Sequence, residues 1–151
     1  MRYEIYSYSS VGPLTWGMTA SEVAAAIGAP SRTSRNRYKN VVEFRDDFSQ
    51  TCIYDAVTIR LVEVTFSSQK DTLFFGATDL IGSSSLEVVR TLFRRDSGAI
   101  TGFDSIVYPQ LGIALTGYLP NKEAIKSASA FASGRWDIAS VGMSSLVVPQ
   151  S

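Results

Sequence analysis

The sequence predicts an α+β fold, a two-layer domain in which two helices cover one face of an antiparallel sheet. Three observations lead to this expectation. Segments that begin at Thr19 and Ser84 have the residue pattern of a helix start, and each is followed by short stretches rich in β-branched and aromatic residues. The two segments match at a constant spacing of 65 residues, which indicates an internal duplication of a helix followed by a strand meander.

The first half is expected to open with a strand and then form its helix. Residues 3–8 alternate aromatic or aliphatic side chains with polar ones, and a Gly-Pro pair then breaks the pattern. The Thr19 hydroxyl can accept from the N–H of Glu22 while the Glu22 side chain returns to the N–H of Thr19, which is a capping box. Gly28, two residues before a proline, is expected to end the helix.

The rest of the first half predicts a loop and a meander of antiparallel strands. The polar run at residues 31–40 has no apolar period and is expected to be a loop or a lead-in to the next strand. Three strands are expected from the β-branched and aromatic residues that follow between turn residues, at positions 41–44, 51–54 and 59–66.

The second half repeats this order. After a short apolar run at residues 73–75, Ser84 is expected to cap the second helix, with the Glu87 side chain completing the cap. A loop is expected at residues 98–102, followed by two strands on either side of a turn at residues 109–112.

The C-terminal part is less regular. The composition of residues 125–131 permits a helix or a strand, and analogy with the first half favours a strand. The tail beyond residue 137 is expected either to add an edge strand or to fray.

The duplication also sets the expected domain organisation. Residues 17–23 match residues 82–88, and residues 41–42 match residues 106–107 at the same spacing. Halves this short would bury too little surface to fold separately. We therefore expect a single domain over residues 1–151, with pseudo-repeats at about 13–75 and 78–137.

Composition excludes several classes of function. The chain has no histidine, which removes every mechanism that needs an imidazole, and no pattern of a catalytic, metal or cofactor site is present. Fourteen basic side chains balance fourteen acidic ones, which disfavours nucleic acid as a partner. No stretch approaches the ~18 apolar residues of a membrane span, and the N-terminus lacks the pattern of a signal peptide. We therefore expect a cytoplasmic protein that is not an enzyme.

Two charged groups are candidate partner-binding residues. An acidic group around the first meander has two interpretations, solvated turn residues or a contact surface for a basic partner. A basic group precedes it, with Lys39 and Tyr38 nearby, and it is either a solvated loop, a surface for an acidic protein, or a patch for RNA phosphates. The candidates are Glu43, Asp46, Asp47 and Asp55 in the acidic group, and Arg32, Arg35 and Arg37 in the basic group.

Two further residues have a structural and a functional interpretation each. Cys52 lies in an expected strand with no histidine to act as its base, which favours a buried structural thiol. Trp136 is either an exposed anchor for a partner or a core residue.

The segment from Gly12 to Val23, which reads GPLTWGMTASEV, and the closing IGAP at residues 27–30 resemble small bacterial immunity proteins of polymorphic and contact-dependent growth inhibition toxin systems. The strand ending YPQLGI and the final FASGRWD are similar to those proteins too. The resemblance implies a cytoplasmic inhibitor that binds a cognate protein toxin and blocks its active site or partner surface. The same core is similar to small outer-membrane assembly lipoproteins, although the lipid-bearing N-terminal cysteine is missing. A small-ligand or RNA-binding module is the remaining alternative.

Overall fold

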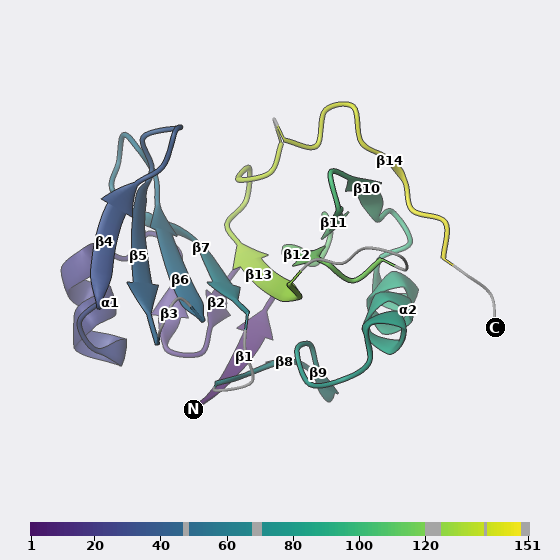
Figure 1. Cartoon of the computed structure of the whole chain (residues 1–151), viewed down its shortest axis with the longest axis horizontal. Coiled ribbons are helices and arrows are strands. Elements are labelled where there is room, and N and C mark those ends of the chain that lie inside the picture. The colour runs from purple at the N-terminus through teal and green to yellow at the C-terminus, as the bar shows by residue number, and fades with distance from the viewer. Residues whose placement is uncertain (47–48, 68–70, 120–124, 138, 149–151) are drawn as a thin grey trace.

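The structure is dominated by strands. The computed structural model describes residues 1–46, 49–67, 71–119, 125–137 and 139–148, and these form 14 strands in two sheets together with two short helices (Figure 1). The expected two-layer α+β fold, with two helices on one antiparallel sheet, is therefore wrong. The protein has a sheet-rich fold with a second sheet that the sequence patterns did not indicate.

The larger sheet has nine strands, and every neighbouring pair in it is antiparallel. Two four-stranded meanders meet at its centre, where Val64 pairs with Ala130 and Thr65 with Ser129. In spatial order the strands are β14 (Ser144–Ser145), β10 (Ile100–Gly102), β11 (Ser105–Tyr108), β12 (Ile113–Thr116), β13 (Ser127–Phe131), β7 (Leu61–Phe66), β6 (Gln50–Tyr54), β5 (Val41–Arg45) and β4 (Arg32–Arg35).

The smaller sheet has five strands and joins the two halves of the chain. Its central strand β1 pairs in parallel with β8 and antiparallel with β2. The N-terminal strand therefore brings together residues 10–11 and residues 72–75, which are far apart in the sequence. In spatial order the strands are β3 (Leu14–Thr15), β2 (Ser10–Val11), β1 (Arg2–Tyr6), β8 (Thr72–Phe75) and β9 (Thr78–Asp79).

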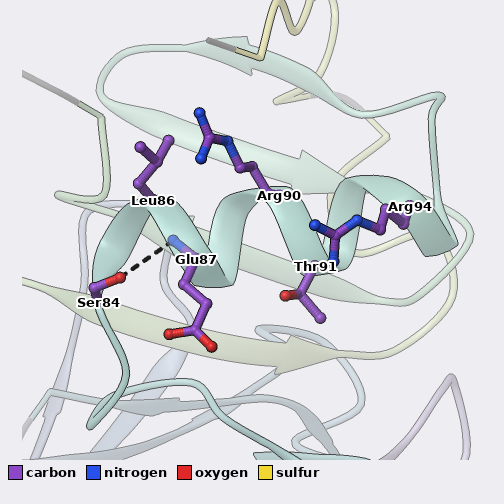
Figure 2. A pocket seen from close by; sticks show the side chains of 6 residues that line it. All are labelled: Ser84, Leu86, Glu87, Arg90, Thr91 and Arg94. Atoms are coloured by element: carbon purple, nitrogen blue, oxygen red, sulfur yellow. Dashed lines mark hydrogen bonds between the residues drawn. The ribbon is translucent and has the colours of Figure 1, made fainter. Parts of the chain in front are cut away.

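The two helices, α1 (Ala20–Ile27) and α2 (Ser85–Arg95), begin 65 residues apart. The capping box of α1 is confirmed, because Thr19 Oγ1 accepts from the Glu22 N–H at 3.2 Å and Glu22 Oε1 accepts from the Thr19 N–H at 3.0 Å. In α2 only half of the box forms. Ser84 Oγ accepts from the Glu87 N–H at 3.3 Å, whereas the Glu87 side chain points away from the start of the helix (Figure 2).

One face of the large sheet carries most of the core. Buried side chains of the helices and of both sheets form one cluster there, and the ring centroids of Tyr3 on β1 and Phe66 on β7 lie 4.8 Å apart. The opposite face is covered in part by residues 132–137 and 139–143, here called the C-terminal segment. Its Trp136 and Met143 pack on a small second cluster of sheet residues, namely Val107, Ala114 and Phe131.

Short strands without a clear apolar pattern explain the error in fold class. β4 reads Arg-Thr-Ser-Arg and contains no apolar residue, so its polar run was expected to be a loop or a lead-in. β10 lies where a loop was expected, and β2, β3 and β9 have only two residues each. Such strands are held by their neighbours in the sheet, so they leave no apolar period in the sequence.

Other expectations about individual elements are confirmed. The preference for a strand near residues 125–131 is right, because β13 spans Ser127–Phe131. The tail adds the edge strand β14, although residues 149–151 lie outside the described part of the chain. Neither described helix has the length and apolar character that crossing a bilayer requires.

Candidate functional site

Two hairpin tips expose large aromatic side chains. Tyr38 lies in the loop between β4 and β5 and is 65% exposed, and Phe103 lies at the tip between β10 and β11 and is 90% exposed. The backbone reaches positive φ in both tips, at Lys39 (+70°) and at Phe103 (+52°) and Asp104 (+67°). Because side chains other than glycine adopt this conformation at a cost, the surrounding hairpins must hold these tips in place.

The first tip is fixed by a small set of hydrogen bonds. Asn36 Oδ1 accepts from the Tyr38 N–H at 2.9 Å and from the Asn40 N–H at 3.1 Å. The Lys39 N–H donates to the Asn36 carbonyl oxygen at 2.9 Å. The tip therefore presents Tyr38 from an ordered loop.

Both aromatic residues line one cleft of about 360 Å³. The C-terminal segment supplies the third large wall, Trp136, and Figure 1 shows that this segment runs along the same side of the molecule as the two hairpin tips. This arrangement is hereafter called the aromatic cleft, and its lining residues are Arg37, Tyr38, Phe103, Ser105, Trp136, Ala139 and Met143.

Trp136 is held in this wall by a buried carboxylate. Glu63 lies on β7 and is 5% exposed, and its Oε1 accepts from Trp136 Nε1 at 3.1 Å and from Arg135 Nε at 3.0 Å. Its Oε2 accepts from the Thr65 hydroxyl at 3.3 Å, and Thr65 shares a 2.7 Å hydrogen bond with Ser129 on the neighbouring strand. The same carboxylate thus connects the large sheet to the C-terminal segment.

Burial and charge act on Glu63 in opposite directions. Burial raises the pKa of its carboxyl group above the ordinary value, because the charged form loses hydration. The Arg135 guanidinium and the hydrogen bonds from Arg135, Trp136 and Thr65 lower the pKa, but the effect of burial is larger.

The basic candidates lie on one hairpin but not on one face. Arg32 and Arg35 are three residues apart on β4, so they project from opposite faces of the strand. Arg32 lies over the ring of Phe44, at 5.6 Å from its centroid, and Arg35 donates to the Lys39 carbonyl oxygen at 2.7 Å. Arg37 is the one of the three that lines the aromatic cleft.

Arg37 is positioned by Tyr38. Its guanidinium lies 4.8 Å from the centroid of the Tyr38 ring, and one of its N–H groups donates to the Tyr38 hydroxyl at 2.6 Å. A guanidinium has five N–H donors in a planar fork, so others remain to meet a carboxylate.

The structure does not bring the acidic candidates together into a surface. Glu43 is buried, so it cannot meet a partner in this conformation. Asp46 lies in a turn at positive φ, and Asp47 is outside the described residues. Asp55 Oδ2 accepts from the N–H groups of Val57 and Thr58, both at 2.9 Å, and these bonds lower its pKa.

Glu43 belongs to a buried network under α1. Its Oε1 accepts from Arg45 at 2.9 Å and from the Tyr54 hydroxyl at 2.6 Å. Arg45 also donates twice to the carbonyl oxygen of Gly28 at the end of α1. Burial, and then the bond to Glu43, raise the pKa of Tyr54. The network connects the helix to the sheet and has a structural explanation.

The remaining reactive residue is structural as well. Cys52 is fully buried, as expected, and burial raises the pKa of its thiol to about 12. A thiol in this state is a poor nucleophile at neutral pH. Within the described residues, no group of three or more metal-ligating acidic or sulfur side chains is close enough to hold an ion.

Two other pockets are weaker candidates for a functional site. One, of about 310 Å³, runs along α2 between Leu86, Glu87, Arg90 and Arg94, and Figure 2 shows these side chains spread over the helix surface. The other, of about 350 Å³, lies near the N-terminus, where the Met1 ammonium pairs with Asp71 at 3.1 Å. Neither combines exposed aromatic side chains with a positioned charge.

Phe103 lines the cleft but was not among the site residues predicted from the sequence. It stands 65 residues after Tyr38, so extending the duplication to the exposed loops would have identified it. Trp136 was expected to be either an exposed anchor or a core residue. In the structure it has features of both, since it packs on Phe131 and also lines the cleft.

Comparison of the chain with protein-family models, with curated proteins and with solved structures finds no match. The resemblance to bacterial immunity proteins therefore stays a prediction.

Proposed function

We propose that this chain is a protein-binding inhibitor, a cytoplasmic immunity protein that neutralises a cognate toxin by covering its active site or partner surface. The observation that carries the proposal is the aromatic cleft. A phenylalanine that is 90% exposed contributes little to folding, whereas exposed aromatic side chains beside an arginine are typical of the residues that dominate protein interfaces.

The way the cleft is built supports the same function. Its aromatic walls come from two hairpin tips and a segment that is hydrogen-bonded to the sheet, so little ordering is needed when a partner binds. Surfaces that are already ordered lose less entropy on association and bind more tightly for the same contacts. An inhibitor benefits from this property because it must remain bound to its target.

A rescue experiment tests the proposal. The product of the gene next to this one is expressed in a sensitive bacterial strain, with or without this chain, and growth is measured. The wild-type chain should restore growth, and the double variant Tyr38→Ala/Phe103→Ala should not. Tyr6→Ala is the matched control, because Tyr6 is 62% exposed on β1 and does not line the cleft.

Two outcomes would contradict the proposal. The first is that the wild-type chain gives no protection and forms no complex with the neighbouring product. The second is that the double variant, shown by circular dichroism to be folded, protects as well as the wild type does.

The stacking of Arg37 on Tyr38 favours a second candidate, an RNA-binding module, because a nucleotide base can stack on such a pair. A gel-shift assay with single-stranded RNA at low salt tests it. Binding that weakens as salt rises would support this function, and no binding at low salt would dismiss it.

A further inference from the structure

The charges at the aromatic cleft are unevenly placed. Among the described residues that line it, Arg37 is the one that carries a charge. Arg35 and Lys39 are exposed on the same hairpin, so positive charge gathers at this end. Asp104 and Asp137 are sequence neighbours of Phe103 and Trp136 but do not line the cleft.

The rest of the cleft suits an apolar side chain. Tyr38, Phe103 and Trp136 offer rigid ring surfaces, and Met143 can adapt its shape to what lies against it. A volume of about 360 Å³ lies at the low end of the range for ligand sites, which fits an anchoring side chain and its close neighbours.

Resting on the proposed function, we propose that the aromatic cleft binds a protein segment in which an acidic side chain stands next to a large apolar one. The carboxylate pairs with the Arg37 guanidinium, whose plane the Tyr38 ring holds in position. The apolar side chain lies against Tyr38, Phe103 and Trp136. The toxin is thus expected to present such a pair on an exposed loop.

Charge balance favours a protein over a nucleic acid as the occupant. RNA would also offer a negative charge beside a flat ring, but its affinity depends on many phosphate contacts. The chain has equal numbers of basic and acidic residues, and one arginine lines the cleft. A single well-placed guanidinium is sufficient for a carboxylate.

A peptide selection on the intact chain tests this inference without knowledge of the toxin. A library of random nine-residue peptides displayed on phage is selected on the wild type, on Arg37→Glu and on Phe103→Ala. The wild type should enrich peptides with Asp or Glu adjacent to Phe, Trp, Leu or Ile. Arg37→Glu should enrich Lys or Arg at the acidic position, and Phe103→Ala should lose the apolar preference.

Affinity measurements on the best selected peptide make the test quantitative. Arg37→Glu should weaken its binding by at least about tenfold, the loss expected when a charge-assisted hydrogen bond is replaced by repulsion. Arg94→Glu is the matched control, since Arg94 is an exposed arginine on α2 outside the cleft, and it should bind as the wild type does. Thermal unfolding confirms that each variant is folded.

The inference is overturned if the wild type enriches nothing, if the enriched peptides lack acidic residues, or if Arg37→Glu leaves the selection unchanged. Tight RNA binding that Arg37→Glu abolishes would also overturn it. The proposed immunity function and the proposed specificity of the cleft can be disproved independently of each other. Loss of rescue together with a clear acidic and apolar selection would remove the immunity role and leave the cleft specificity intact.

Discussion

Glu63 is a charged residue on a central strand of the large sheet, and its neighbours explain how the fold accommodates it. Its carboxylate receives hydrogen bonds from Arg135, Trp136 and Thr65. A buried charge is costly unless it is paired and hydrogen-bonded, and here both conditions are met. Because two of the donors belong to the C-terminal segment, the same bonds place Trp136 in the wall of the aromatic cleft.

Removing this acceptor is expected to destabilise the protein more than neutralising it. Glu63→Ala leaves the Arg135 and Trp136 donors without a partner and should lower the free energy of unfolding by about 2–4 kcal/mol. Glu63→Gln keeps a carbonyl oxygen at the same place and should stay within about 1 kcal/mol of the wild type. Urea unfolding measures both.

The fluorescence of Trp136 gives a local readout of the same change. In a Trp16→Phe background Trp136 is the remaining tryptophan, and Glu63→Ala should shift its emission to longer wavelength as the side chain meets water. Equal stability of the Ala and Gln variants, with unchanged emission, would show that Glu63 does not hold the C-terminal segment.

The raised pKa of Glu63 predicts the direction of a pH effect. Its carboxyl group binds a proton more readily in the folded state than in the unfolded chain, where the ordinary value is 4.5. Protonation therefore favours folding, and this contribution is complete below the unfolded-state pKa and is lost as pH rises through the folded-state pKa. The wild type should gain stability relative to Glu63→Gln as pH falls from about 7 to about 4.

Paired unfolding curves at several pH values measure this difference. Comparison with Glu63→Gln cancels the titration of all other groups, because the glutamine does not titrate. A difference that stays constant would mean that Arg135 and the hydrogen bonds to Glu63 balance the effect of burial, and one that moves in favour of Glu63→Gln at low pH would mean that they outweigh it.

At the scale of the elements, the two helix starts differ in how completely they are capped. Thr19 forms the full capping box in α1, whereas Ser84 forms one hydrogen bond in α2. Thr19→Ala should therefore cost about 1–2 kcal/mol of unfolding free energy and Ser84→Ala about 0.5–1 kcal/mol. Chemical unfolding of the two variants beside the wild type gives the comparison, and a larger loss for Ser84→Ala would contradict it.

The contrast between helices and edge strands explains how much of the fold could be predicted. The start of a helix is determined by residues close together in the sequence, so the cap at Thr19 could be predicted correctly from the sequence alone. The edge strand β4 depends on its pairing with β5, which is set by tertiary structure and not by the composition of Arg32–Arg35. Several such strands together form the extra sheet area that changes the fold class.

The candidate site was predicted in part for the same reason. Arg37 was selected by the local density of basic residues, and the structure places it in the aromatic cleft. Glu43 was selected in the same way as an acidic surface residue, but strand alternation turns it toward the core, where it pairs with Arg45. The cleft itself joins residues more than 60 positions apart, and its walls meet only after the two hairpins and the C-terminal segment are in place.

At the scale of the whole molecule, pairings between the halves should make unfolding a single event. β7 and β13 join the two meanders, and one buried cluster extends through both halves. Trp16 and Trp136 report on opposite halves of the chain, so the single-tryptophan variants Trp136→Phe and Trp16→Phe should show urea transitions with the same midpoint as the far-ultraviolet circular dichroism of each variant. If a substitution changes the stability of a protein that unfolds in one step, the fluorescence and dichroism midpoints of that variant shift by the same amount. If the halves unfold independently, the two midpoints differ. A gap of more than about 0.5 M between the fluorescence and dichroism midpoints of one variant, which at a slope of about 2 kcal/mol per M amounts to about 1 kcal/mol, would mean that the pairing of β7 with β13 does not couple the two meanders.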